Sequence, residues 1–126
     1  MVVKPSSEIT LENNTLIQVV RPSVKEVTLE VAKNLTEEVM EACGDKEYPL
    51  IFDSNEIVYA NADARIFYRN AELLQNIKAI AIVAKNETAK LVSRVIFYTK
   101  KNSIPVEAFY NKADAQAWIE SLSLVC

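Results

Sequence analysis

The sequence contains no histidine and only one glycine among its 126 residues. Without histidine, the Ser-His and Cys-His pairs that activate a nucleophile are excluded, and so is a histidine phosphorelay. With Gly44 alone, the chain has no glycine-rich loop of the kind that cradles nucleotide phosphates. Two distant cysteines without histidine do not make a standard zinc site. We therefore expect a protein that is not an enzyme and that uses no metal or cofactor.

Net charge and hydropathy exclude further classes of function. The formal net charge is −3 and the longest basic run is Lys100-Lys101, which argues against nucleic-acid binding. No apolar run approaches the roughly 18 residues of a membrane-spanning helix, and the N-terminus has no signal-peptide core. We expect a cytoplasmic protein. There, two free thiols at Cys43 and Cys126 are a simpler interpretation than a disulfide between them.

A chain of this length fits one domain, 1–126, in which residues 1–7 are expected to be a flexible N-terminus. Alternating residues over 8–12, a two-residue Asn13-Asn14 turn and the β-rich run 15–20 predict an opening hairpin. A helix ending at Gly44 follows. Its start is ambiguous, because Ser23 with Glu26 matches a capping box while Thr28 is also a good cap.

The remaining chain alternates between apolar runs and helical patterns. The expected strands are 48–52, 77–84 and 104–110, and the expected helices are 63–75, 87–101 and 111–122. The order ββαβαβαβα predicts an α/β domain with a mixed, mostly parallel sheet of about five strands and about four helices. Pro105 favours an edge position or a strand start for the last strand, and Trp118 is expected to be a core anchor of the last helix.

Several segments together resemble one family of small bacterial proteins. They are VTLEVAKNL before the Gly-terminated helix, PLIFD, IKAIAIVAKN and PVEAFYNKADAQAWIESL, with Phe109, Ala113 and Trp118 as the most specific part. The chain resembles the SpoIIAA-like or STAS-like group from about Glu8 to Leu122. That group is related in fold to anti-sigma-factor antagonists and to lipid-binding CRAL-TRIO (Sec14) domains. The resemblance implies a STAS-like fold and a role in binding.

In the antagonists, a helix opens with a phosphorylatable serine followed by glycine. In this sequence the corresponding segment is Asn61-Ala62-Asp63-Ala64, with Ala62 or Asp63 at the place of the hydroxyl and no glycine after it. The phosphorylation switch is therefore not expected here. Asn61 and Asp63 match a helix N-cap and a first-turn carboxylate, which is the commoner interpretation of such residues. A contact with a partner is the alternative.

The expected helix 87–101 is apolar around much of its circumference. Val92, Val95, Ile96 and Thr99 suffice for one buried face, which leaves other large side chains on flanking or opposite sides. These are Leu91, Phe97 and Tyr98. Such a helix packs on two sides, and the second side is a homodimer contact, a lid over a small hydrophobic ligand, or a wide core face. Basic residues around the helix, Arg94 among them, favour an acidic partner or an anionic lipid head group, or are simply solvated.

From the sequence we expect a binding or regulatory module that acts through protein–protein contacts, by self-association or with an unknown protein partner. The alternative is a carrier or sensor of a small hydrophobic ligand held between the 87–101 helix and the sheet. The candidate surface residues are Asn61, Asp63, Leu91, Arg94, Phe97 and Tyr98.

Overall fold

The computed structural model describes residues 2–3, 6–69, 75–97 and 104–122. Its elements follow in the order β1 (Val2–Val3), β2 (Ser7–Glu12), β3 (Thr15–Val20), β4 (Glu26–Val27), α1 (Leu29–Cys43), β5 (Tyr48–Asp53), β6 (Tyr59–Ala60), α2 (Ala62–Tyr68), β7 (Ile77–Val83), α3 (Glu87–Phe97), β8 (Val106–Phe109) and α4 (Lys112–Ser121).

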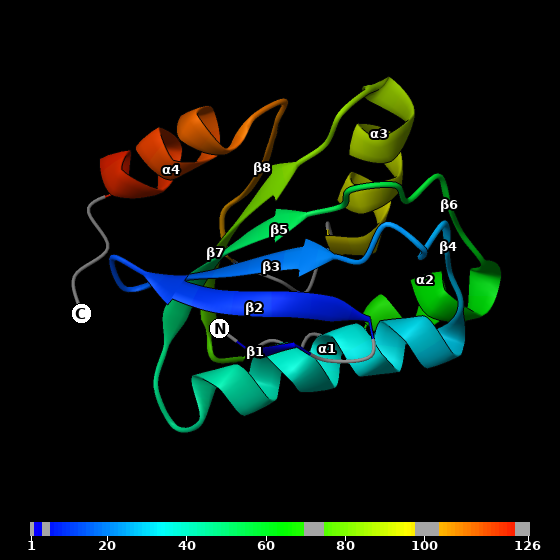
Figure 1. Ribbon diagram of the computed structural model, residues 1–126, viewed down its shortest axis with the longest axis horizontal. Coiled ribbons are helices and arrows are strands. Elements are labelled where there is room, and N and C mark those ends of the chain that lie inside the picture. Colours follow the sequence, from blue (N-terminus) through cyan, green and yellow to red (C-terminus); the bar gives the residue numbers. More distant parts are fainter. Residues whose placement is uncertain (1, 4–5, 70–74, 98–103, 123–126) are drawn as a thin grey trace.

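The main sheet has six strands in the order β1-β2-β3-β5-β7-β8 (Figure 1). The β1–β2 and β2–β3 pairs are antiparallel, and the three pairs from β3 to β8 are parallel. This confirms the expected α/β fold with a mixed, mostly parallel sheet and four helices. The sixth strand, β1, was not predicted, because residues 1–7 were expected to be a flexible N-terminus. Val2 and Val3 instead pair with Ile9 and Glu8, and Ser6 and Ser7 are buried.

Helices cover the two faces of the sheet unequally. The strands β3, β5, β7 and β8 are joined by α1, α2 and α3, which lie on one face, whereas α4 alone lies on the other (Figure 1). The larger core therefore forms under α1–α3, around side chains such as Leu35, Phe52 and Ile82. The smaller core, between α4 and the sheet, includes Ile51, Ala81 and Ile119. Because β7 contributes to both cores, its side chains are almost all buried, which the continuous apolar run predicted.

Local chemistry explains the boundaries of the N-terminal elements. Asn13 and Asn14 both have positive φ, 51° and 60°, which is the backbone of a two-residue hairpin turn. Thr28 caps α1 by accepting a hydrogen bond from the Val31 N–H at 3.2 Å, so the helix begins at the later of the two predicted starts. Gly44 ends α1 with φ of 60°, and its N–H donates to the Met40 carbonyl.

A second sheet of two short parallel strands, β4 and β6, was not predicted. It pairs Val27 with Ala60, and the Asn61 N–H donates to the Val27 carbonyl at 3.1 Å. Each strand is followed immediately by a helix start, so this pairing sets the N-termini of α1 and α2 side by side. Two-residue strands leave no periodic pattern in a sequence, which is why they were missed.

Two helices are shorter within the described residues than expected. The predicted helix 63–75 is α2, ending at Tyr68, and the predicted helix 87–101 is α3, described as far as Phe97. Residues 70–74 and 98–103 lie outside the described residues. Ile66 is exposed, because the buried positions of α2 are Ala64 and Tyr68.

Candidate functional site

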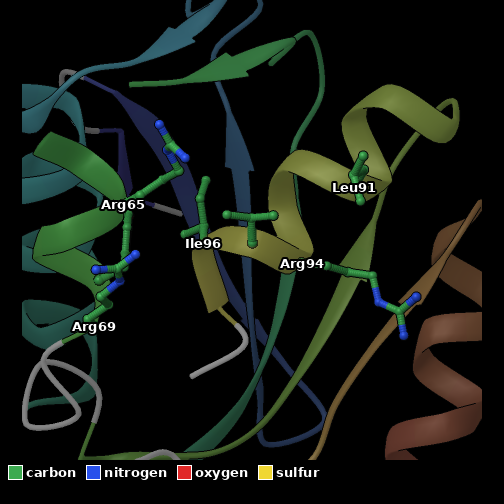
Figure 2. A pocket seen from close by; sticks show the side chains of 7 residues that line it. Arg65, Arg69, Leu91, Arg94 and Ile96 are labelled. Carbon is green, nitrogen blue, oxygen red and sulfur yellow. The ribbon is translucent and has the colours of Figure 1, made fainter. Parts of the chain in front are cut away.

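A surface hollow lies between α2 and the α3 helix, with a volume of about 590 Å³ (Figure 2). Two turns of α3 contribute its apolar wall, and α2 contributes two arginines and a tyrosine. The described lining residues are Arg65, Tyr68, Arg69, Leu91, Arg94, Val95 and Ile96. A volume of this size is within the range of about 300–1,000 Å³ that is usual for small-molecule sites. We call this region the α2–α3 hollow.

The charged side chains of the hollow are all basic among the residues described. Arg94 makes an ion pair with Glu107 on β8 at 3.5 Å, so its guanidinium turns away from α2 (Figure 2). Arg65 lies within α2 and Arg69, four residues later, is its C-cap, and within the described residues neither forms an ion pair. The α2 side of the hollow therefore carries two positive charges that no carboxylate among the described residues neutralises.

The exposed part of α3 confirms one sequence expectation and corrects another. Leu91 is 66% exposed and Val95 48% exposed, so α3 presents large apolar side chains to solvent. Leu91 was predicted on the outer side. Val95 was predicted in the buried face and is not part of it. Ile96 is buried and Val92 partly buried, as predicted, and the other buried residues of α3 are Ala89, Ser93 and Phe97.

Phe97 was a candidate surface residue, and that assignment is wrong. It is 4% exposed, and its ring lies 4.8 Å from Phe52 and 5.6 Å from Tyr68, centroid to centroid. The buried face of α3 is rotated by about one residue from the predicted face, and it includes the small residues Ala89 and Ser93. The error arose because small residues contribute little to a hydrophobic pattern. Tyr98, the neighbouring candidate, lies outside the described residues.

Asn61 and Asp63 have the local roles that their spacing predicts. The Asn61 Oδ1 accepts a hydrogen bond from the Ala64 N–H at 2.9 Å, which caps α2. Asp63 is exposed in the first turn, where a carboxylate stabilises the positive end of the helix dipole. Neither residue lines the α2–α3 hollow.

Between α3 and the sheet, where the lid hypothesis places a ligand, the described side chains of Ile96 and Phe97 are buried. Beside Phe97, a void of about 10 Å³ is lined by residues including Thr36 and Tyr68. That volume suits about one water molecule. Burial raises the pKa of the neighbouring Tyr68 well above its usual value. A hydrogen bond with the Thr36 side chain opposes this effect, and the nearby Glu38 carboxylate adds to it.

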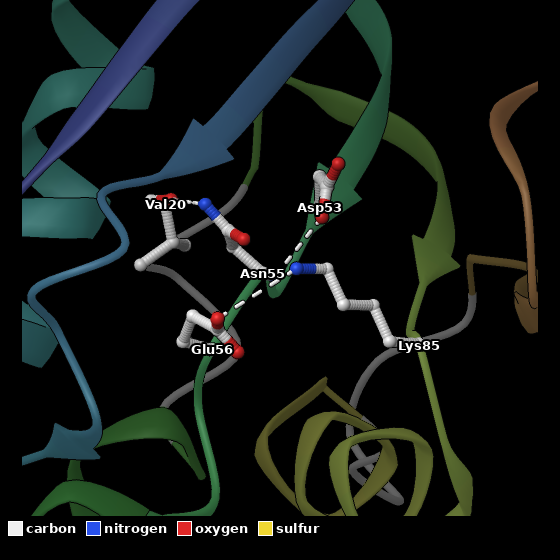
Figure 3. Close-up of polar contacts among 5 residues, drawn as sticks. All are labelled: Val20, Asp53, Asn55, Glu56 and Lys85. Atoms are coloured by element: carbon white, nitrogen blue, oxygen red, sulfur yellow. Dashed lines mark hydrogen bonds and ion pairs between the residues drawn. The ribbon is translucent and has the colours of Figure 1, made fainter.

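The carboxyl ends of the parallel strands are a common place for sites in α/β proteins. Here the polar groups bond mainly to one another (Figure 3). Asp53 accepts from the Asn55 N–H at 2.9 Å, the Asn55 amide donates to the Val20 carbonyl at 2.8 Å, and Lys85 lies 3.8 Å from Glu56. These contacts close the loop after β5 and leave no converging set of free groups.

The described thiol and hydroxyl groups nearby are not placed for chemistry. Ser54, after β5, is fully buried and its hydroxyl donates to the Val83 carbonyl at 3.2 Å. Cys43 is a buried free thiol, and burial raises its pKa. Cys126 lies outside the described residues. Within the described ranges, His, Cys, Asp and Glu side chains do not gather into a metal-binding group, and no helix is long and apolar enough to cross a membrane.

Basic residues predicted around α3 have local partners where they are described. The Lys90 ammonium lies 4.9 Å from the centre of the Tyr110 ring, Lys85 pairs with Glu56, and Arg94 pairs with Glu107. The arginines of α2 were missed as site residues. The i, i+4 spacing of Arg65 and Arg69 was visible in the sequence, but only the packing of α2 beside α3 shows which surface they share.

Comparisons with known proteins bear on the fold and the family. A solved structure described as an uncharacterised protein from the DUF3478 family with a SpoIIAA-like fold, from Shewanella loihica PV-4, superposes with a TM-score of 0.57. It is 17% identical in sequence, and the match covers 90% of this chain and 91% of that one. This confirms the SpoIIAA-like fold. The comparison with curated proteins gives no match. A family model described as a domain of unknown function, DUF7793, matches residues 9–123, and the chain belongs to that family.

Proposed function

We propose that this chain is a non-enzymatic binding or regulatory module whose contact surface is the α2–α3 hollow. The observation that carries the proposal is the exposure of Leu91 and Val95, two large apolar side chains one turn apart on α3. Exposed apolar side chains grouped at a hollow are typical of surfaces that bind a partner or ligand. The absence of histidine and of a glycine-rich loop supports a role in binding rather than in catalysis.

Protein–protein contact through this surface suits an unlike partner better than a second copy. In a twofold-symmetric dimer the same patch faces itself. Arg65 and Arg69 of both copies would then meet across the interface, and juxtaposed like charges are costly there. Self-association is therefore expected only if the surface meets a different, acidic part of the second copy.

The second candidate is the carrying or sensing of a small hydrophobic ligand. The volume of the hollow, about 590 Å³, favours it. The site differs from the one expected from the sequence, since it lies beside α3, on the α2 side, and not between α3 and the sheet.

Native mass spectrometry and sedimentation velocity of protein purified from its source cells test the proposal. We expect a bound mass or a complex that the double variant Leu91→Glu/Val95→Glu loses while its melting temperature stays within a few degrees. Leu11→Glu, at an exposed apolar residue of β2, is the matched control and should retain the bound species. A bare monomer, or a bound species that survives in the double variant, would contradict the proposal.

A further inference from the structure

We infer that the α2–α3 hollow binds a single-chain amphiphile with an anionic head group, so that Arg65 and Arg69 hold the head and the α3 wall holds the chain. The inference rests on the ligand-binding form of the proposed function and names the chemical class of the ligand.

The head-group site follows from the two α2 arginines. They lie four residues apart, Arg65 within α2 and Arg69 at its C-terminal cap, and this spacing places both side chains on the side of α2 that lines the hollow. Both line the hollow, and within the described part of the chain no carboxylate pairs with either. Like charges at this spacing repel, whereas a carboxylate or phosphate between them accepts hydrogen bonds from both and removes that repulsion. Guanidinium groups match such anions in geometry.

The chain site follows from the α3 wall. Leu91 and Val95 lie one turn apart, and Ile96 closes the inner end where the hollow meets the core. Leu91 and Val95 are solvent-exposed in the absence of a ligand, so an aliphatic chain laid against them removes apolar surface from water. Arg94 lies on the same helix but is held toward β8 by Glu107 (Figure 2), which leaves the wall between Leu91 and Val95 aliphatic.

The combination of two arginines with an apolar wall favours an anionic single-chain amphiphile over other ligands. A cationic or zwitterionic amphiphile would meet two arginines that no described carboxylate neutralises, and a short anion would leave the apolar wall exposed. The volume of about 590 Å³ suits one drug-sized or single-chain molecule rather than a two-chain phospholipid. Head charge and chain length are therefore the two variables to test.

Isothermal titration calorimetry of the full chain with dodecanoate below its micelle concentration tests both variables. We expect dodecanoate to bind at least about 100-fold more tightly than butanoate, because each buried methylene adds to affinity. Dodecyltrimethylammonium, which has the same chain and the opposite charge, should bind at least about tenfold more weakly than dodecanoate. Equal affinity for the two dodecyl compounds, or no dodecanoate binding, would overturn the inference.

Two charge variants distinguish binding of the head group by Arg65 and Arg69 from nonspecific electrostatic attraction. Arg65→Gln/Arg69→Gln should weaken dodecanoate binding about tenfold or more. The matched control Lys33→Gln/Lys46→Gln removes two exposed positive charges from α1 and the loop after it, and should leave the affinity unchanged. Equal losses in both variants would mean that net charge alone drives binding, which also overturns the inference.

An experiment with vesicles distinguishes binding of a free amphiphile from binding to a lipid surface. Flotation with vesicles of phosphatidylglycerol and phosphatidylcholine is expected to leave the protein unbound. Vesicle binding without binding of monomeric dodecanoate would reject the inference in favour of a membrane contact. If dodecanoate does not bind but Leu91→Glu/Val95→Glu still removes a bound species from source-purified protein, the contact surface stands and only the ligand class is wrong.

Discussion

The ring of Phe97 meets the ring of Phe52 edge-on, with centroids 4.8 Å apart and planes at 71°. This pair joins the last described residue of α3 to β5. The side of α3 that carries Phe97 therefore packs in the core, and the opposite side faces solvent. An aromatic pair in this geometry contributes beyond its buried area.

Phe97→Ala is therefore expected to lower the free energy of unfolding by about 3–5 kcal/mol, the usual loss when a buried phenylalanine is truncated. Leu91→Ala, on the opposite side of the same helix, should change it by less than about 0.5 kcal/mol. Urea denaturation followed by circular dichroism measures both. Comparable losses in the two variants would show that Leu91 belongs to the core and that α3 has no free side.

Glu38 is a buried carboxylate of α1 that holds the start of β2. It accepts hydrogen bonds from the Ser7 hydroxyl at 2.6 Å and from the Ser6 N–H at 3.2 Å. Glu38→Ala leaves both donors buried without a partner and should cost about 2–4 kcal/mol. The matched change Glu37→Ala, at the exposed neighbour, should cost less than about 0.5 kcal/mol. Equal effects in urea denaturation would contradict this role for Glu38.

Tyr68 makes stability depend on pH in alkaline solution. Its pKa is raised in the folded protein by burial, so above pH about 10 the unfolded chain loses the phenolic proton while the folded chain keeps it. Its contribution is fully present below pH about 10 and declines as the pH rises from there toward the folded pKa, by up to ~1.4 kcal/mol per pH unit. Tyr68→Phe should remove this part of the slope in urea midpoints measured from pH 9 to 11. An identical slope in the variant would show that other groups cause it.

Asn61 is predicted to act as a helix cap and not as a binding residue. Asn61→Ala should lower the free energy of unfolding by about 1 kcal/mol, and Asn61→Asp, which keeps the acceptor oxygen, by much less. Dodecanoate affinity should be the same in both variants, because Asn61 does not line the α2–α3 hollow. An affinity change in Asn61→Ala with the melting temperature unaltered would instead place a binding contact there.

The five longer strands and the helix caps could be predicted because their signals are local. The continuous run of β7, the Asn13-Asn14 turn and the cap residues of α1 and α2 act within a few positions of themselves. The buried side of α3 could not be predicted, because it is set by how α3 meets Phe52 and Tyr68 and not by the strongest apolar stripe. The arginine pair of the hollow was missed for a similar reason. The sequence does not show that residues 65 and 69 share a surface with Leu91 and Val95, because that depends on how α2 packs beside α3.

The two outer strands of the main sheet have a consequence for aggregation. Within the described residues, β1 has two residues and pairs with Glu8 and Ile9 of its neighbour, and β8 has four residues and follows Pro105. An added strand needs a long row of free backbone groups, and short edges beside a proline offer few. These two short strands therefore offer a poor template for growth of the sheet from one molecule to the next.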